Sequence, residues 1–240
     1  MFAGIVKHQH SLNRGAHSVV TSRDFKERLT RRARRADVQV SPALAASLEH
    51  YYRLLELWNK KINLTGLCLS PPEDETFDRL LVEPLLAAKH VPSHPIVAID
   101  IGSGSGSPAI PLALACPAVS IRMVESKTRK AVFLTEAVRH LGIANAAVET
   151  ARFEQLLARP ALHEAADLVT VRAVRVEART LSTLQAFLRP MGRLFWFRST
   201  SGPTAPSNIP PPLRWTATHP LLDSNSSRLV ILGKDLVASR

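Results

Sequence analysis

The chain has 240 residues, of which 45% are hydrophobic, so it can bury the core of one ordinary domain with a small appendage. Its formal net charge of +11 at pH 7 favours a polyanionic partner, and its two cysteines, Cys68 and Cys116, support neither a disulfide framework nor a zinc site. No apolar run approaches the roughly 18 residues of a membrane span, so the sequence predicts a soluble, cytoplasmic protein that binds no membrane and no metal.

The first elements carry much of the positive charge. Residues 1–21 show no hydrophobic period and are predicted to be a poorly ordered tail. An amphipathic helix is predicted from Ser22, because an apolar stripe adjoins charged residues at helical spacing. Residues 1–40 hold nine Lys and Arg against three acids, so the charged face is either solvated or in contact with RNA phosphate. The arginines on that face are Arg28, Arg31, Arg32 and Arg35.

A second helix is predicted to begin with Ser41 as its N-cap and Pro42 in its first position. Apolar residues recur every three or four positions as far as Ile62, where a segment that includes Asn63 interrupts the pattern. Taken alone, the asparagines of this segment are interpreted as packing and capping groups.

A third helix is predicted over Phe77–Lys89, after a loop that contains two consecutive prolines. It carries Arg79 and Glu83 at i,i+4, the spacing of an ion pair on one helix face. We therefore expect residues 22–92 to form an N-terminal helical lobe in front of a catalytic core at 93–240.

The segment Ile96–Pro111 reads as a buried strand, a glycine turn and the start of a helix. Three glycines in the turn let a ligand lie against peptide N–H groups, and Ser107 with Pro108 is predicted to cap the helix. A dinucleotide fingerprint would need glycine where Ser107 stands, whereas Asp-x-Gly-x-Gly-x-Gly is the pattern of Rossmann-like S-adenosylmethionine (SAM) enzymes. A purely structural turn is the alternative. The glycines are Gly102, Gly104 and Gly106.

After the turn, predicted strands and helices alternate, which indicates a mostly parallel α/β sheet with helices on both faces. Residues 199–212 are rich in Pro and Ser and are predicted to be a mobile loop before a closing antiparallel pair. The predicted strands are 96–101, 120–124, 147–150, 167–173, 192–197, 213–218 and 228–232, and the predicted helices are 127–141 and 180–188.

Read together, these segments resemble the RsmG family (glucose-inhibited division protein B) of bacterial small-subunit rRNA guanine-N7 methyltransferases. The resemblance implies a Rossmann-like class I SAM-dependent methyltransferase that acts on a guanine in the decoding-region loop of 16S rRNA. SAM is then the cofactor, and 16S rRNA or a small-subunit precursor is the partner. The segments that carry the resemblance are 58–60 with 62–65, 102–111, 125–134, 152–154, 172–174 and 228–231.

The chain departs from the family pattern mainly on the substrate side. It has Ala109 in place of a glycine, Leu80 after Arg79 in place of a histidine, Glu83-Pro84 in place of Asp-Ser, and Arg198-Ser199 in place of Lys-Gly. Leucine cannot replace histidine, and arginine stands in only partly for lysine.

Acids and an arginine that follow successive strands complete the expected site. Glu125 is placed to accept hydrogen bonds from the ribose hydroxyls, with a surface acid as the alternative. Phe153 and Glu154 are expected to bound the adenine. Arg172 is expected to face the methionine carboxylate or the target nucleotide, and a structural ion pair is the alternative. The cofactor residues are thus Gly102, Gly104, Gly106, Ser107, Glu125, Phe153, Glu154 and Arg172, with Arg172 catalytic; the substrate residues are Asn63, Arg79, Arg198 and the four arginines of the first helix.

The chemistry asks little of the side chains, because guanine N7 carries a lone pair and no proton and so needs no general base. Pyrimidine-C5 methylation would need a nucleophilic cysteine at the sheet edge, and neither Cys68 nor Cys116 falls there. Two other classes stay open: a methyltransferase of a small molecule or protein, and a non-catalytic RNA-binding module.

Overall fold

A computed structural model of the chain describes residues 20–199, 204, 206–222 and 227–236. Almost all of the segment predicted to be a poorly ordered tail, 1–21, lies outside the described residues. So do positions 200–203 and 205 of the loop predicted over 199–212.

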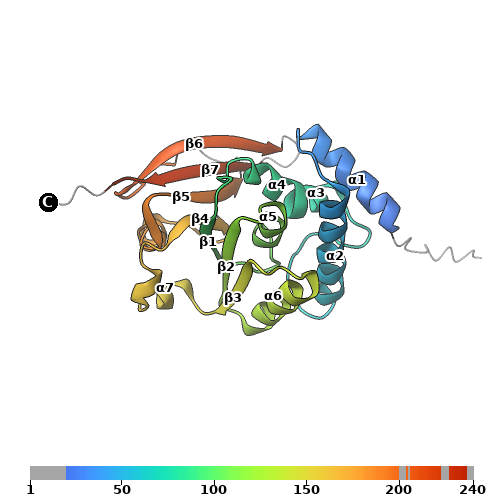
Figure 1. Ribbon diagram of the computed structural model, residues 1–240, viewed down its shortest axis with the longest axis horizontal. Helices are drawn as coiled ribbons and strands as arrows, with labels where there is room; N and C mark the ends of the chain where they lie inside the picture. The colour runs from blue at the N-terminus through green and yellow to red at the C-terminus, as the bar shows by residue number, and fades with distance from the viewer. Residues whose placement is uncertain (1–19, 200–203, 205, 223–226, 237–240) are drawn as a thin grey trace, which may run out of the picture.

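The centre of the molecule is a seven-stranded sheet in the order β3-β2-β1-β4-β5-β7-β6 (Figure 1). The first five strands run parallel, and β7 lies antiparallel between β5 and β6. This confirms the predicted α/β sheet with a closing antiparallel pair. The strands are β1 (Ile96–Ile101), β2 (Val119–Glu125), β3 (Ala146–Thr150), β4 (Ala166–Arg172), β5 (Leu188–Ser199), β6 (Leu213–Leu222) and β7 (Ser227–Lys234).

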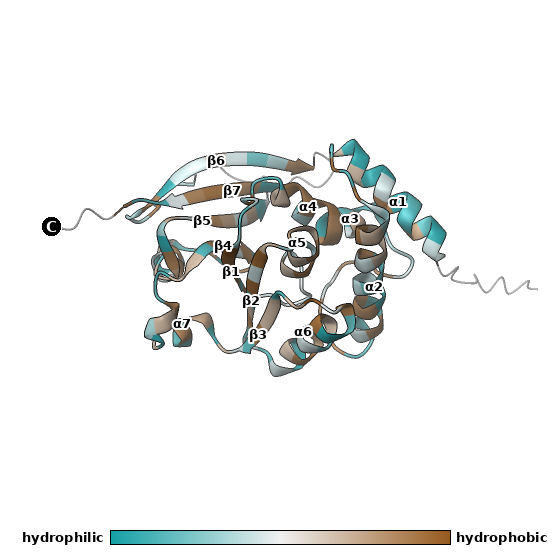
Figure 2. Cartoon of the chain, in the orientation of Figure 1, coloured by the Kyte–Doolittle hydropathy of each residue, from teal (hydrophilic) through white to brown (hydrophobic). Residues whose placement is uncertain are grey.

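Alternate side chains of β1, β4, β5 and β7 enter two cores, one on each face of the sheet. Ala98 of β1 belongs to the larger core, and its neighbour Ile99 belongs to the smaller one. The larger core lies under α5 (Ala109–Ala115), α6 (Thr128–Leu141) and the N-terminal helices, and Figure 2 shows the hydrophobic colouring of the strands and inner helix faces between them. The smaller core lies under α7 (Phe153–Leu156), η2 (Pro160–Leu162) and α8 (Ala178–Leu184).

The N-terminal helices share the larger core with the sheet. The rings of Phe25, Tyr52 and Phe77, from three different helices, lie with centroids 4.8 to 5.8 Å apart in that core. The division of the chain between residues 92 and 93 stays a prediction. The helices are α1 (Ser22–Arg35), α2 (Pro42–Asn59), α3 (Asp74–Phe77), the π-helical turn η1 (Asp78–Val82) and α4 (Glu83–Ala88).

Two local predictions about helix ends are wrong. Ser107 does not cap α5, since the helix begins at Ala109 and the Ser107 hydroxyl donates instead to the carbonyl of Leu80, 3.0 Å away. The helix predicted over 180–188 ends at Leu184, and β5 already begins at Leu188. Pro190 lies within β5, where the register with β4 shifts, so the missing proline N–H breaks no regular ladder there.

Candidate active site

A cavity of about 650 Å³ opens where the carboxyl ends of β1, β2 and β4 meet. Open parallel sheets bind ligands at this edge, because the glycine turns and the helix starts converge there. The cavity is lined by Leu64, Thr65, Gly66, Leu67, Glu75, Arg79, Leu80, Gly102, Ser103, Gly104, Ser105, Ser107, Glu125, Lys130, Arg172 and Ala173.

The glycine loop forms one wall of the cavity. Residues with a side chain would disfavour its backbone conformation, because a Cβ would collide with neighbouring atoms. Gly102 has a φ of +72°, and a Cβ there would lie 2.7 Å from Cγ2 of Val174. Gly106 has a φ of +91°, and a Cβ there would lie 2.6 Å from Cδ1 of Ile110. Gly106 does not line the cavity, so the structure shows for it only close packing against Ile110. Its contact with the cofactor stays a prediction. The hydroxyl of Tyr51, on α2, donates to the carbonyl of Ser105, 2.8 Å away, and so holds the glycine loop against α2.

Glu125 ends β2 and holds the loop in place. One carboxylate oxygen accepts from the N–H of Gly104 at 2.9 Å, and the other accepts from the N–H of Lys127 at 2.7 Å. A carboxylate has about four acceptor positions, so about two remain for a ligand. Because Glu125 also lines the cavity, it can accept hydrogen bonds from a pair of hydroxyls.

Asp100, the only charge of β1, is buried beneath the loop. Its Oδ1 accepts from the Thr170 hydroxyl, while its Oδ2 has no partner among the described residues. Burial raises the pKa of this carboxyl from 3.8 to about 6, and the hydrogen bonds from Ser103 and Thr170 oppose that rise. In the sequence, Asp100 is only the first position of the Asp-x-Gly-x-Gly-x-Gly pattern, and no role is predicted for it.

Arg172, at the end of β4, lines the cavity and is held by Arg79 of η1 and Glu83 of α4. Its Nη1 donates to the carbonyl of Arg79 at 2.5 Å, and its Nη2 forms an ion pair with the buried carboxylate of Glu83. Its guanidinium carbon lies 5.3 Å from the centroid of the Phe197 ring. Burial lowers the pKa of Arg172, and Glu83 opposes that shift. Arg172 thus lines the cavity and forms a structural ion pair at the same time, and its role in binding or catalysis stays a prediction.

The predicted ion pair between Arg79 and Glu83 is wrong. Arg79 lies 3.3 Å from Glu75 instead, while Glu83 accepts from Arg172 and from the Ser227 hydroxyl. The physical reason is the π-helical turn η1, which lies between Arg79 and Glu83 and shifts the phase of the helix across it, so that these two residues no longer share a face. Arg79 nevertheless lines the cavity, as expected of a substrate residue.

Phe153, Glu154 and Asn63 are among the predicted site residues that do not line the cavity. Phe153 is half-buried on the smaller core, and Glu154 is exposed in the first turn of α7. Asn63 is exposed, while the next two residues along the chain do line the cavity. The roles given to these three residues stay predictions.

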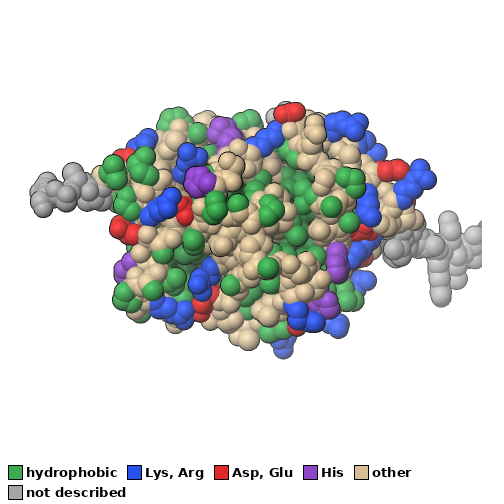
Figure 3. Space-filling model, viewed as in Figure 1, with side chains coloured by type: hydrophobic (Ala, Val, Ile, Leu, Met, Phe, Trp, Pro, Cys, Tyr) green, Lys and Arg blue, Asp and Glu red, His purple; other side chains and the backbone are tan. Residues whose placement is uncertain are grey.

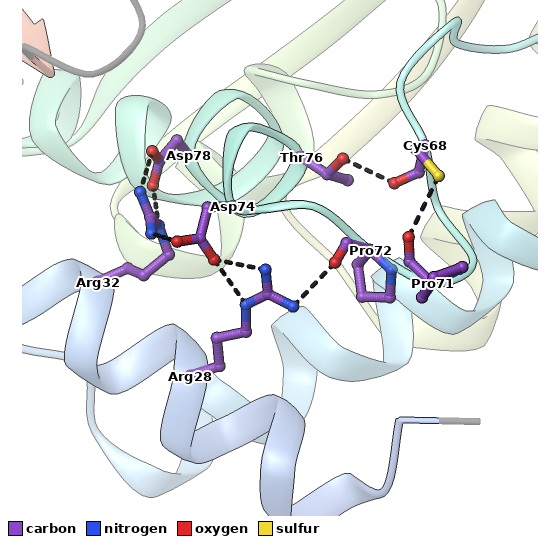
Figure 4. A network of polar contacts seen from close by, with 8 residues as sticks. All are labelled: Arg28, Arg32, Cys68, Pro71, Pro72, Asp74, Thr76 and Asp78. Atoms are coloured by element: carbon purple, nitrogen blue, oxygen red, sulfur yellow. Dashed lines mark hydrogen bonds and ion pairs between the residues drawn. The ribbon is translucent and has the colours of Figure 1, made fainter. Parts of the chain in front are cut away.

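The arginine stripe of α1 requires a correction, because two of its members are occupied within the chain (Figure 4). Arg32 has a side chain only 9% exposed and pairs with the buried Asp78 and with Asp74. Arg28 pairs with Asp74 and donates to the carbonyl of Pro72 at 2.8 Å. These contacts attach α1 to the helical segment that carries Arg79, so Arg28 and Arg32 are structural.

Arg31 and Arg35 are exposed, as is Arg34, which the sequence did not single out. Within the part of the chain that the structure describes, none of the three makes an ion pair. They line a surface hollow of about 750 Å³ between α1 and the start of α2. Figure 3 shows Lys and Arg side chains along the α1 side of the molecule. The hollow is larger than the cavity at the strand ends, but no strand end or glycine turn reaches it.

Sequence reasoning also missed residues that complete the site. Tyr51 falls within the apolar period of the second predicted helix, and nothing in that pattern shows that its hydroxyl reaches the glycine loop. Lys130 also lines the cavity. It lies in the segment 125–134, which carries part of the family resemblance, so the sequence could have identified it as a site residue. In the described residues, no group of three or more His, Cys, Asp or Glu is placed to hold a metal, and no helix is long and apolar enough to cross a membrane.

Comparison with solved structures shows the fold. The chain is similar to a SAM-dependent methyltransferase from Aquifex aeolicus, with a TM-score of 0.51 and 12% identity over 68% of this chain and 94% of that one. It is also similar to the [4+2]-cyclase SpnF, with a TM-score of 0.54 and 13% identity over 68% and 83% of the two chains. At such identities the likeness concerns architecture alone, which is shared by different activities.

Comparison of sequences is more specific. The chain is 36% identical over 195 residues to ribosomal RNA small subunit methyltransferase G of Xanthomonas campestris pv. campestris (strain 8004), covering 80% of this chain and 87% of that protein. It is 38% identical over 162 residues to the protein of the same name from Stenotrophomonas maltophilia (strain K279a), covering 66% and 68%. A family model described as rRNA small subunit methyltransferase G (GidB) matches residues 44–204, which hold the glycine loop, Glu125 and Arg172. The chain belongs to the rRNA small subunit methyltransferase G family.

Proposed function

We propose that this protein transfers a methyl group from SAM to N7 of a guanine in the decoding-region loop of 16S rRNA. Its substrate is 16S rRNA or a precursor of the small ribosomal subunit, and it acts in the cytoplasm. The observation that carries the proposal is the cavity at the strand ends, where a glycine loop and Glu125 face Arg172 in a chain of this family.

The residues of the cavity fit SAM. The glycine loop lets a ligand approach the backbone closely, and Glu125 retains about two acceptor positions for the ribose hydroxyls. Arg172 has five N–H donors, and its contacts with Arg79 and Glu83 leave donors for the methionine carboxylate or the target nucleotide. When bound, SAM supplies an electrophilic methyl group on a sulfonium.

The transfer itself needs orientation more than acid or base. The N7 lone pair forms the new N–C bond as the S–C bond breaks, the electron pair of that bond stays on sulfur, and no proton moves. The protein's task is to hold N7 in line with the methyl group and to keep water out. Neither Cys68 nor Cys116 lines the cavity, which favours this route over one with a covalent enzyme–base adduct.

Three exposed arginines of α1 supply a surface for the RNA backbone. Arg31, Arg34 and Arg35 are exposed and form no ion pair within the described residues, although Glu27 lines the same hollow and Asp74 interacts with Arg31 through space. Phosphates are the natural partners of such groups. The proposed RNA contact thus keeps Arg31 and Arg35 of the predicted stripe, omits Arg28 and Arg32, and adds Arg34.

The test is methyl transfer from labelled SAM to small subunits or 16S rRNA that lack the modification. The proposal expects label in 16S rRNA and none in total protein or in transfer RNA added as a control. Label in protein or a small molecule alone would refute it, and so would RNA binding without any transfer.

A further inference from the structure

Among the described residues, two acids line the cavity at the strand ends, and the proposed SAM site uses only one of them. Glu125 holds the glycine loop and retains acceptor positions for the ribose hydroxyls. The other acid is Glu75 of α3, which lies with Arg79 of η1 on the wall that the N-terminal segments form. Glu75 has no part in the cofactor site as proposed above.

The position of Glu75 is fixed by contacts that its neighbours make on other sides of the helical segment (Figure 4). Asp74 pairs with arginines of α1, and the Thr76 hydroxyl donates to a carbonyl of the preceding loop at 2.7 Å. Farther along the segment, the carbonyl of Arg79 accepts from Arg172 at 2.5 Å. These contacts leave α3 no freedom to rotate, so Glu75 stays on the cavity wall.

The carboxylate of Glu75 has room for further hydrogen bonds. Its Oε1 lies 3.3 Å from Nε of Arg79, the one polar contact that this carboxylate makes within the described residues. A carboxylate has about four acceptor positions, so about three remain for a ligand. The side chain is 49% exposed, so a ligand can reach it without displacing the chain.

Guanine offers donors that match this carboxylate. Enzymes that act on a base in RNA or DNA commonly take it out of the stack and read its Watson–Crick edge. On that edge guanine presents N1–H and an N2 amine side by side, whereas adenine has an acceptor at N1 and no N2 amine. The guanidinium of Arg79, beside the carboxylate, suits the neighbouring acceptor O6.

Binding by this edge also leaves the reacting atom free. N7 lies on the other side of the purine from N1 and N2, so a guanine held by Glu75 has its N7 directed away from that wall and toward the glycine loop. Sites for drug-sized ligands measure about 300 to 1,000 Å³, so a cavity of about 650 Å³ has room for a base beside the methyl end of SAM.

We propose that Glu75 binds the target base, accepting hydrogen bonds from N1–H and the N2 amine of guanine while N7 faces the methyl group of SAM. This inference rests on the proposed function and adds to it a residue that selects guanine. Glu75 is then a substrate-binding residue on α3.

The test couples the carboxylate to the N2 amine. After the methylated nucleotide has been mapped with the wild-type protein, 16S rRNA is prepared by ligation with either guanosine or inosine at that position and is assembled into small subunits. Inosine keeps N7, O6 and N1–H and lacks only the amine. Rates are measured on both substrates for wild type, Glu75→Ala and the control Glu73→Ala. The control removes the same charge two positions earlier, from an exposed side chain that caps no N–H and lies outside the cavity.

Wild type and Glu73→Ala should share one preference for guanosine over inosine. The preference of Glu75→Ala should be smaller by about 10-fold or more, the usual effect of losing one hydrogen bond to a charged group. The influence of the amine on the reactivity of N7 is the same for all three proteins, so it cancels in this comparison.

Equal slowing of Glu75→Ala on both substrates would overturn the inference, because the carboxylate would then only position Arg79. A loss of SAM affinity in calorimetry with an unchanged preference would also overturn it, since Glu75 would then bind the amino group of the cofactor. Failure of the wild type to methylate the guanosine substrate would refute the proposed function instead.

Discussion

Replacing Arg32 by alanine should destabilise the fold, although the sequence places Arg32 among the arginines expected to contact RNA. Its side chain is 9% exposed and pairs with Asp78, whose side chain is 1% exposed. Removing one partner of a buried pair costs about 3 to 5 kcal/mol, because the remaining charge keeps its desolvation penalty. At about 2 to 4 °C per kcal/mol for a chain of this size, Tm should fall by roughly 6 °C or more.

The matched control is Arg31→Ala, one residue earlier on the same helix, exposed and without an ion pair in the described chain. It should change the unfolding free energy by no more than about 0.5 kcal/mol. Urea unfolding of both variants, followed by circular dichroism, measures the difference. Equal stability of the two variants would refute the structural role given to Arg32. A double variant that also carries Asp78→Asn should recover part of the loss.

The exposed arginines of α1 should also contribute to RNA binding. Changing Arg31, Arg34 and Arg35 together to alanine should flatten the slope of log affinity against log salt by about 0.7 to 0.9 for each phosphate that is no longer neutralised. An unchanged slope would show that these arginines do not contact RNA phosphates. Glu125→Gln should weaken SAM binding by about 1 to 3 kcal/mol in calorimetry, and wild-type affinity in a folded variant would contradict its place on the ribose. Arg172→Lys should lose about 10²-fold or more in methyl transfer, since lysine cannot reproduce the fork held by Glu83 and the Arg79 carbonyl, and a wild-type rate would make Arg172 purely structural. The folded-state pKa of Asp100, raised from 3.8 to about 6, gives stability that is present below pH 3.8 and lost as the pH rises through about 6. Relative to Asp100→Asn, the wild type should thus lose up to about 3 kcal/mol of unfolding free energy over this range, and parallel pH profiles would contradict the burial of this carboxyl.

The sheet and its order of elements could be predicted because their signals are local. The apolar run 96–101 coincides with β1, and the alternation after it leaves a parallel sheet as the natural arrangement. Boundaries were harder to predict where a proline suggested the end of a helix. Pro190 lies instead inside β5 at a register shift, and such an irregularity depends on strand pairing that the sequence does not display.

That Gly102, Gly104 and Glu125 line one cavity could be predicted for the same reason. They lie at or directly after the ends of β1 and β2, and the topology brings those ends to one edge of the sheet. Which oppositely charged residues meet could not be predicted. Arg31 and Arg32 are neighbours with identical side chains, and only the packing of α1 decides that Arg32 is buried against Asp78.

The cavity of about 230 Å³ beside Arg172 could not be predicted from the sequence, because three segments far apart in the chain form it. These segments bring Glu83, Arg172 and Ser227 together. The π-helical turn that separates Glu83 from Arg79 has no distinctive sequence pattern, so the sequence does not predict it. The departure from lysine at Arg198 was visible, but the stacking on Trp196 that orients it was not.

The central claim is methyl transfer to N7 of one guanine, and direct identification of the product tests it best. Small subunits that lack the modification are incubated with the protein and methyl-labelled SAM, and the 16S rRNA is then digested for mass spectrometry and cleaved with borohydride and aniline to locate the methylated nucleotide. The account predicts 7-methylguanosine at a single site in the decoding-region loop, abolished or strongly reduced with Arg172→Lys. Label on another base, or no label from folded protein that binds SAM, would contradict it.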